Sequence, residues 1–444
     1  MPTELPAAVS LGLVNESTID ISISRTLAHR FRLGLLDPLE IQPFSFFSSG
    51  QESLSKPSSL QLIQDATAQG IVLVKNDVNT LPFKKGIKLA VVGPLGTSQV
   101  GLMGDYYADA VCNDGTFSCV PTLSSAFTAA NTGGTVTTVL GCTVQGNDSS
   151  WGSAIAAVLE ADAIVLALGT DTSVGHEGTD LQDIGLPGVQ REFGLAVLVA
   201  AGNKPLVLVI VSIFPTAFDD LLISPAIVLA YAPTFGAPAI ASSIFGDENR
   251  WGRAVMTVYP LKYQETVSIY DFGIVPSDVN SGRTYRYYTG SAGAPLVKFG
   301  EGLSYSTFSL SCSGSFDPSG ADSISISCNT TLLSGPDGDL VLMAFHRPSS
   351  DVIGRIGSSH PVPLSSLAGF DRISVGSAQG LVQVTIDLLA SKALSLVDNT
   401  GASVLYPGLH FIDIWDGSIN NVTLAIEVPE ELGRVVKRPP LMTK

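Results

Sequence analysis

The sequence predicts a mixed α/β protein with two large domains, a doubly wound α/β sandwich followed by an all-β sandwich. Between residues 56 and 272, short runs that are apolar on both faces alternate with helical patterns. After residue 284, the pattern changes to short runs in which apolar and polar residues alternate. Of the 444 residues, 45% are hydrophobic and 14% are charged, which argues against disorder. A chain of this length can bury two or three cores.

The region 56–272 carries the α/β pattern. We expect helices over 60–68, 153–161 and 187–201. The last of them has Pro187 in its first turn and Gly202 after its end, as helices prefer. We expect buried strands over 88–92, 163–168, 206–211 and 227–230. Strands that are apolar on both faces and separated by helices favour a parallel sheet covered on both sides, so the predicted domain is flavodoxin-like.

The flanking regions have other patterns. Residues 1–55 contain one amphipathic helical stretch, over 19–33, and then a linker. Residues 273–283 form a second linker that contains Pro276 and Gly282. Residues 284–430 alternate in the manner of antiparallel strands, with turn residues between the runs and no evident helix of any length. This pattern predicts a fibronectin type III-like, or immunoglobulin-like, sandwich. Residues 431–444 form a tail.

The charge balance limits the partners. There are 24 basic and 40 acidic residues, giving a formal net charge of -16. Such a chain should repel nucleic acid and anionic membranes, whereas neutral sugars remain compatible; acidity that only aids solubility is the simpler alternative. The longest apolar runs, such as 206–214, are far below the roughly 20 residues that cross a bilayer. We therefore expect no nucleic-acid partner and no membrane partner.

Cysteines and glycosylation motifs suggest an oxidising compartment, although the chain's first residues show no signal peptide. Five cysteines allow two disulfides, for which Cys112 with Cys119 and Cys312 with Cys328 are plausible partners and Cys142 is the odd residue. Buried thiols are the alternative. Four sequons, a weak signal on their own, begin at Asn15, Asn147, Asn329 and Asn421.

The densest cluster of titratable residues follows the second predicted strand. The loop 169–180 contains Asp171, His176, Glu177 and Asp180. Parallel sheets place their sites at the carboxyl ends of strands, so this loop is the predicted site. A loop carboxyl group pressed against a neighbouring domain could act as a general acid. The alternative is an ordinary solvated loop.

Other signals are weaker. The segment 93–96 follows a strand and contains two glycines, but it lacks a third glycine in register and Pro94 lacks an N–H for phosphate. The five histidines are scattered, with no pair at helical spacing. We therefore expect no cofactor and no metal. Trp151, Trp251 and Trp415 could stack on sugar rings, although isolated tryptophans more often belong to a core.

Two segments, 282–288 and 299–308, have distinctive sequences. Six further segments are informative together with them, namely 12–20, 27–38, 71–76, 103–107, 367–372 and 406–408. In this order along the chain, these segments resemble glycoside hydrolase family 3, especially its β-xylosidase-like branch, and the first two are the most specific matches. The resemblance implies that residues 1–55 are a remnant of the catalytic (β/α)8 barrel and that 56–272 and 284–430 are the family's two later domains. It further implies cofactor-independent, retaining hydrolysis of terminal β-linked sugars such as xylan-derived oligosaccharides, by an enzyme that is extracellular when complete.

The same resemblance both supports and weakens the predicted site. The family branch has a Val-Glu-Ala-Glu-Gly-x-Asp-Arg pattern here, of which this chain keeps Glu177 but has Gly175 and Leu181 in place of the first Glu and the Arg. Glu177 is the candidate acid/base, with Asp171, His176 and Asp180 as candidate substrate-binding residues. No segment resembles the barrel strand with the nucleophilic Asp. We therefore expect this chain alone to be inactive; a non-catalytic carbohydrate-binding or interaction module is the alternative.

Overall fold

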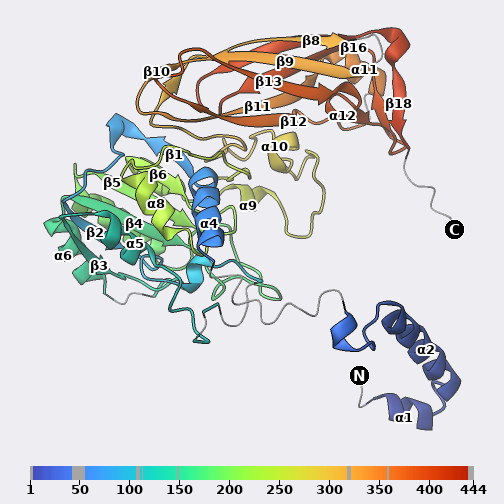
Figure 1. The fold of residues 1–444 in the computed structure, drawn as a ribbon, viewed down its shortest axis with the longest axis horizontal. Coiled ribbons are helices and arrows are strands. Elements are labelled where there is room, and N and C mark those ends of the chain that lie inside the picture. The colour runs from blue at the N-terminus through green and yellow to red at the C-terminus, as the bar shows by residue number, and fades with distance from the viewer. Residues whose placement is uncertain are drawn as a thin grey trace. The chain divides into compact units, whose positions relative to one another are not determined.

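The computed structural model describes residues 4–42, 56–106, 111, 112, 114–147, 150–317, 322–357 and 360–438. The chain divides into two compact units, Met1–Ser59 and Leu60–Lys444. Each unit is described by itself (Figure 1).

The first unit is helical. It contains α1 (Leu5–Ser10), α2 (Glu16–Arg32) and the short 3₁₀ helix η1 (Leu39–Ile41). The helix predicted over 19–33 is therefore confirmed. None of the residues of these three helices is buried, and Ile23, Leu27 and Phe31 on α2 are all exposed. Among the described residues of this unit, these apolar side chains of α2 are therefore left open to solvent to a large extent.

The second unit begins with a six-stranded sheet. Its strands are β1 (Val72–Asn76), β2 (Lys88–Val92), β3 (Thr135–Val139), β4 (Ala163–Gly169), β5 (Leu206–Val211) and β6 (Ala226–Leu229). The spatial order is β1-β6-β5-β4-β2-β3, and every pair is parallel except β1 with β6. Numbered among themselves, the five parallel strands have the order 2-1-3-4-5 of doubly wound sheets. The four predicted strands are confirmed, but β1 and β3 were not predicted.

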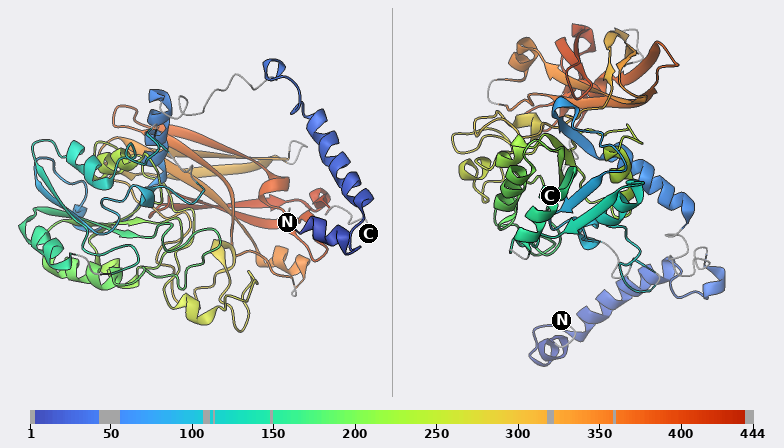
Figure 2. Two further views of the ribbon diagram at one scale, coloured as in Figure 1. Left: turned by 90° about the horizontal axis from the view of Figure 1, so that it is seen from below. Right: turned by 90° about the vertical axis from the view of Figure 1, so that its left-hand side faces the viewer.

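Helices cover both faces of this sheet (Figures 1 and 2). On one face lie α5 (Leu123–Ala130) and α8 (Ala237–Ile244), and on the other lie α6 (Trp151–Glu160) and α7 (Gln190–Ala201). The helix α4 (Pro57–Gly70) leads into β1. Three of these helices were predicted, but α7 begins at Gln190, so Pro187 precedes the helix and does not lie in its first turn. The helices α5 and α8 were not predicted, because eight-residue helices give too little periodicity to stand out.

The rest of the second unit is mainly antiparallel. One sheet has the order β12-β11-β16-β17 and the other β13-β9-β8, with an apolar core between them. Their strands are β8 (Ser311–Asp317), β9 (Ser323–Thr330), β11 (Gly338–Pro348), β12 (Ser366–Val375), β13 (Val382–Leu389), β16 (Gly408–Trp415) and β17 (Asn421–Val428). Smaller pairings involve β7 (Thr307–Phe308), β10 (Leu332–Ser334), β14 (Leu396–Val397), β15 (Ser403–Leu405) and β18 (Arg434–Lys437).

The expectation that no helix follows residue 284 was wrong. Short helices are present as α10 (Thr284–Tyr287), α11 (Ser350–Ile356) and α12 (Ala390–Ala393). The segment between Thr284 and Ser306 contains α10 and loops, and the first strand begins only at Thr307. A further short helix, α9 (Tyr263–Thr266), lies in the region before the predicted linker. Helices of one or two turns are set by their tertiary contacts, so their sequences carry little signal of their own.

The predicted cysteine pairing is confirmed. Cys112 bonds Cys119, and Cys312 bonds Cys328 across the β8–β9 pair, where the two residues lie opposite each other. Cys142 is a buried thiol. Both bridges close short loops, of separation 7 and 16.

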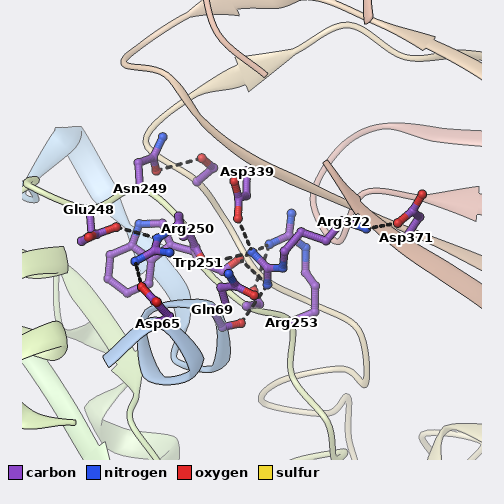
Figure 3. A network of polar contacts seen from close by, with 12 residues as sticks. Asp65, Gln69, Glu248, Asn249, Arg250, Trp251, Arg253, Asp339, Asp371 and Arg372 are labelled. Atoms are coloured by element: carbon purple, nitrogen blue, oxygen red, sulfur yellow. Dashed lines mark hydrogen bonds and ion pairs between the residues drawn. The ribbon is translucent and has the colours of Figure 1, made fainter. Parts of the chain in front are cut away.

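A polar network joins the α/β region to the β-sandwich (Figure 3). Arg372 on β12 donates from Nη1 to the carbonyl of Arg250 at 3.0 Å and to Asp339 at 3.1 Å, and from Nη2 to the carbonyl of Gln69 at 2.8 Å. In the opposite direction, Arg253 donates from Nε to the carbonyl of Asp416 at 2.7 Å. One guanidinium from each region therefore satisfies main-chain carbonyls of the other.

Replacing Arg372 with Ala should lower the free energy of unfolding by roughly 2–4 kcal/mol, because Asp339 and three carbonyl groups lose a largely buried donor. Urea unfolding followed by fluorescence measures the loss. The matched control is Arg355→Ala, which breaks a more exposed ion pair with Glu430 and should cost less than about 1 kcal/mol. Equal losses in the two variants would contradict the importance of this network.

Two buried histidines lie side by side in the β-sandwich. Nε2 of His346 and Nδ1 of His410 are 2.9 Å apart, and Nε2 of His410 lies 2.9 Å from the carbonyl oxygen of Tyr406. Because a carbonyl only accepts, neutral His410 donates from Nε2 and accepts from His346 at Nδ1. Burial, followed by the neighbouring His410, lowers the pKa of His346 to about 3, and burial also lowers the pKa of His410.

This pair should make the protein less stable in acid. The unfolded chain, with a histidine pKa of about 6.5, binds more protons than the folded chain between about pH 6.5 and 3, so the free energy of unfolding falls as the pH falls through that window. In His346→Gln, the slope of the unfolding free energy between pH 6 and 4 should shrink by up to about 1.4 kcal/mol per pH unit. Urea titrations at several pH values measure the slope. His360→Gln, which alters a half-buried histidine outside the core, is the control, and an unchanged slope in His346→Gln would disprove the assignment.

Candidate functional site

The sheet topology creates one point at which loops diverge. From β2 the chain continues to β3 on one side, whereas from β4 it continues to β5 on the other side. β2 and β4 are parallel neighbours, so the loops that follow them leave from adjacent strand ends on opposite sides. Such a switch point is the usual ligand site of a doubly wound sheet. The loops in question are 93–106 after β2 and 170–189 after β4.

The base of the second loop is held firmly. Gly169 has φ 147°, and a Cβ there would lie 1.8 Å from the carbonyl oxygen of Val211, so only glycine fits. Its N–H donates to Oε1 of buried Gln190 at 2.9 Å, and Nε2 of Gln190 donates back to the carbonyl of Gly169 at 2.9 Å. The next residue, Thr170, shares a 2.6 Å hydroxyl hydrogen bond with Ser212 after β5. The loop therefore starts from a rigid base.

The tip of the loop is a tight turn. The backbones of His176 and Thr179 exchange hydrogen bonds of 3.0 and 2.9 Å, which places Glu177 and Gly178 at the end of the turn. Nδ1 of His176 lies 2.7 Å from the carbonyl oxygen of Glu177 and so donates to it. Oδ2 of Asp105 accepts from the N–H of Glu177 at 2.8 Å. The two loops of the switch point thus meet at Glu177.

The four predicted site residues do not share one environment. His176, Glu177 and Asp180 are exposed, and they lie at the tip of the loop or just after it. Asp171 lies half-buried at the base, where its Oδ1 accepts from the backbone N–H of Ser173 at 2.8 Å. Asp171 therefore shapes the turn that leads to the tip, and the structure brings the other three residues to the surface.

Gly175 occupies a confined position. It is buried, and a Cβ there would lie 3.1 Å from the side chain of Leu181 and 3.2 Å from the ring of Phe214. A larger side chain would have to displace one of these neighbours by a few tenths of an ångström. Gly175 and Leu181, which replace the first Glu and the Arg of the family pattern, thus lie against each other.

Asp105 is the site residue that the sequence analysis did not select. It lies 72 positions before Glu177, and its segment was noted only for its resemblance to the family. Nothing in the sequence signals this contact, because only the neighbouring positions of β2 and β4 in the sheet bring Asp105 to the loop after β4. Tyr107, the last residue of that segment, lies outside the described residues.

A groove of about 1010 Å³ begins where the loop ends. Its walls include polar residues such as Asp180, Gln264 and Arg283 and apolar residues such as Phe214 and Phe272. Tyr263 also lines it, and burial, followed by the neighbouring Tyr259, raises its pKa to about 12. Nearby, Ile269, Tyr270 and Phe272 are among the most exposed apolar residues of the described chain.

No candidate metal cluster of His, Cys, Asp or Glu occurs among the described residues. Within the same residues, no helix is long and apolar enough to span a bilayer. What the site offers chemically is a set of carboxylates and one imidazole on an exposed turn beside a groove.

Comparison with known proteins identifies the origin of this arrangement. Residues 71–305 match the glycosyl hydrolase family 3 C-terminal domain. The chain belongs to glycoside hydrolase family 3. It is 32% identical over 438 residues to Beta-D-xylosidase 3 of Arabidopsis thaliana, covering 92% of this chain and 54% of that protein. It is 29% identical over 422 residues to Exo-1,4-beta-xylosidase bxlB of Emericella nidulans, covering 92% and 53%.

Solved structures share the fold of this family 3 chain. A GH3 exo-beta-xylosidase (XlnD) in complex with a xylobiose aziridine probe superposes with a TM-score of 0.78 at 24% identity, covering 99% of this chain and 57% of that one. A β-glucosidase from Listeria innocua in complex with glucose gives 0.72 at 23%, covering 96% and 56%. The chain thus spans about half the length of the relatives it matches.

The contact between Asp105 and Glu177 should control the mobility of the loop tip. In Asp105→Asn, the N–H of Glu177 loses a charged acceptor, and amide exchange in 176–179 should speed up by roughly 3–10-fold. Hydrogen–deuterium exchange read by mass spectrometry measures this. Asp180→Asn is the matched control, because no hydrogen bond to its side chain occurs among the described residues, and a similar acceleration there would refute the contact.

Proposed function

We propose that this chain is the later part of a retaining family 3 glycosidase that acts on terminal β-linked sugars, with β-xylosides from hemicellulose as its substrates. The carrying observation is the exposed turn with Glu177, held at the switch point by Asp105 and by a rigid base. The β-xylosidase names of its relatives support the substrate class.

In this proposal Glu177 is the general acid/base. A retaining glycosidase needs an acid that protonates the leaving oxygen and a nucleophilic carboxylate about 5–5.5 Å away. Asp171, His176 and Asp180 are the proposed substrate-binding residues, with His176 placed to contact sugar hydroxyls and Asp171 acting through the shape of the loop. The nucleophile would come from a barrel domain, since no part of this chain resembles the family's nucleophile strand.

The exposed apolar surface supports a role for a further domain. Ile269 and Phe272 line the groove at the end of the loop, and exposed Tyr270 lies between them in sequence; clustered exposed apolar residues mark interaction surfaces. A domain seated there would exclude water from the turn. The neutral acid form of Glu177 would then be favoured over its carboxylate. In the first unit, the exposed apolar side chains of α2 fit the proposal that this unit is a barrel remnant.

A second candidate function is a non-catalytic carbohydrate-binding or interaction module. The observation that favours it is the packing of Gly175 against Leu181, which fills the loop where the family pattern has a Glu and an Arg. The two disulfides fit an oxidising compartment, so either function is proposed to be extracellular.

Activity measurements distinguish the two candidates. The purified chain alone should show no turnover of aryl β-xylosides above the blank, because a single carboxylic acid cannot form the glycosyl-enzyme intermediate. Fused behind the barrel of a related family 3 enzyme, it should restore activity, and Glu177→Gln should then lower the rate on poor leaving groups by roughly 10²–10⁴-fold. Activated aryl leaving groups, which need little protonation, should be affected much less.

The matched control is Glu160→Gln, an exposed carboxylate at the end of α6, which should leave the rate unchanged. A fusion that stays inactive with the wild-type chain and gains activity with Gly175→Glu would favour a degenerate module. Turnover by the chain alone would contradict the proposed division of labour.

A further inference from the structure

The β-sandwich carries an aromatic cavity remote in sequence from the loop 169–180. Its volume is about 560 Å³, within the range of about 300–1,000 Å³ that is typical of small-ligand sites. Its walls come from β11, β16, β17 and the segment between Thr257 and Phe299. Five aromatic residues line it, namely Tyr285, Tyr288, Phe299, Phe345 and Trp415. The rings of Tyr285 and Phe299 are stacked, with centroids 4.2 Å apart.

Of the three tryptophans, Trp415 is the one that lines this cavity. Trp251 is 1% exposed and belongs to the core, and Trp151 packs edge-on against Phe193 at 5.4 Å. Trp415 is half-buried, and its Nε1 donates to the carbonyl of Ser418 at 2.9 Å. The indole is therefore fixed in orientation and already satisfied as a donor, which leaves its ring for packing.

Asn421 lies directly opposite Trp415. The two residues are partners in the β16–β17 register, and side chains of such pairs stand on the same face about 5 Å apart. Asn421 is exposed, lines the cavity, and makes no side-chain hydrogen bond within the described residues. It begins the sequon Asn421-Val422-Thr423. An exposed acceptor asparagine therefore adjoins a fixed aromatic ring.

The disulfides provide an independent argument. Cys112–Cys119 and Cys312–Cys328 are expected in proteins that pass through an oxidising compartment. That is also where asparagine in such sequons is glycosylated. The oxidising compartment that the disulfides imply is therefore one in which the sequon at Asn421 can be glycosylated.

We propose that Asn421 carries an N-linked glycan whose first N-acetylglucosamine lies in this cavity against the indole of Trp415. The modification joins Nδ2 of Asn421 to the anomeric carbon of the sugar and breaks the bond from that carbon to the diphosphate of a polyprenyl-linked donor. The diphosphate leaves with the electron pair, and the amide loses one proton. The C–H face of the pyranose packs on the aromatic ring, and the covalent tether supplies the effective concentration that makes so small a contact persistent.

The other sequons give the comparison. Asn15 and Asn147 are exposed, and neither lines the aromatic cavity. Asn329 is half-buried in β9, the middle strand of its sheet. Glycans at Asn15 or Asn147 would extend freely into solvent, whereas a glycan at Asn421 should be ordered by Trp415.

The test uses the full chain secreted from yeast behind a cleavable leader. Mass spectrometry of peptides should find a glycan on Asn421. Hydrogen–deuterium exchange of residues 408–428 should then be roughly 3–10-fold slower than in Asn421→Gln. In Trp415→Leu, which keeps an apolar side chain but removes the ring, the same comparison should show less than a two-fold difference. Asn147→Gln, the matched control, should leave exchange in 408–428 unchanged.

A second measurement does not depend on the Trp415 variant. Trimming the wild-type glycan to a single sugar with endoglycosidase H should preserve the slow exchange, because the proposal assigns it to the first sugar. An unmodified Asn421, or loss of protection on trimming, would overturn the proposal. So would xylobiose slowing exchange equally in unglycosylated Asn421→Gln, because the cavity would then be a site for free saccharides.

Discussion

The structure of the second unit depends on one short segment, residues 248–253, to which both of its regions bond through the main chain. Arg372 from the β-sandwich donates to the carbonyls of Arg250 and Trp251, while Arg253 from the segment donates to the carbonyl of Asp416 in the β-sandwich. Burial is the main reason that the pKa of Arg253 falls to about 10, with Arg372 lowering it further and Asp416 opposing the fall. The group still remains charged at neutral pH. Carbonyl oxygens and a neighbouring carboxylate therefore hold two cationic groups in a poorly hydrated interface.

The segment 248–253 is connected to the candidate site by the residues that follow it in the chain. Residues after Arg253 lead to α9 and to the groove lined by Tyr263 and Phe272. Tyr259, Tyr263 and Tyr288 pack together there, with the first two stacked at 4.1 Å. The same stretch thus connects the interface with the β-sandwich to the groove beside the loop 169–180. On the proposed function, the surface that a further domain would contact is therefore continuous in sequence with the interface to the β-sandwich.

Sequence reasoning recovered the parts of the fold that local patterns encode. The strands β2, β4, β5 and β6 are apolar on nearly every residue, and this pattern can be read from the sequence without knowledge of the tertiary fold. The strand β3 (Thr135–Val139) was not predicted because it is an edge strand with no fully buried residue. The strand β1 was not predicted because its antiparallel pairing with β6 follows from the tertiary fold. The loop 169–180 was found because it follows an evident strand. Its contact with Asp105 was not, because only the strand order brings residues 105 and 177 together.

The same reasoning explains why the proposed function requires a further domain. A general acid works near neutral pH only if its environment disfavours the carboxylate, and desolvation is the usual cause. The turn with Glu177 is exposed within this chain, and its fixed points, Asp105 and Gln190, hold the backbone rather than cover the carboxyl group. On the proposed function, this region therefore supplies the position of the acid, and the domain that brings the nucleophile also supplies the dry environment. A catalytic pair divided in this way becomes competent only when the two domains close on the sugar between them.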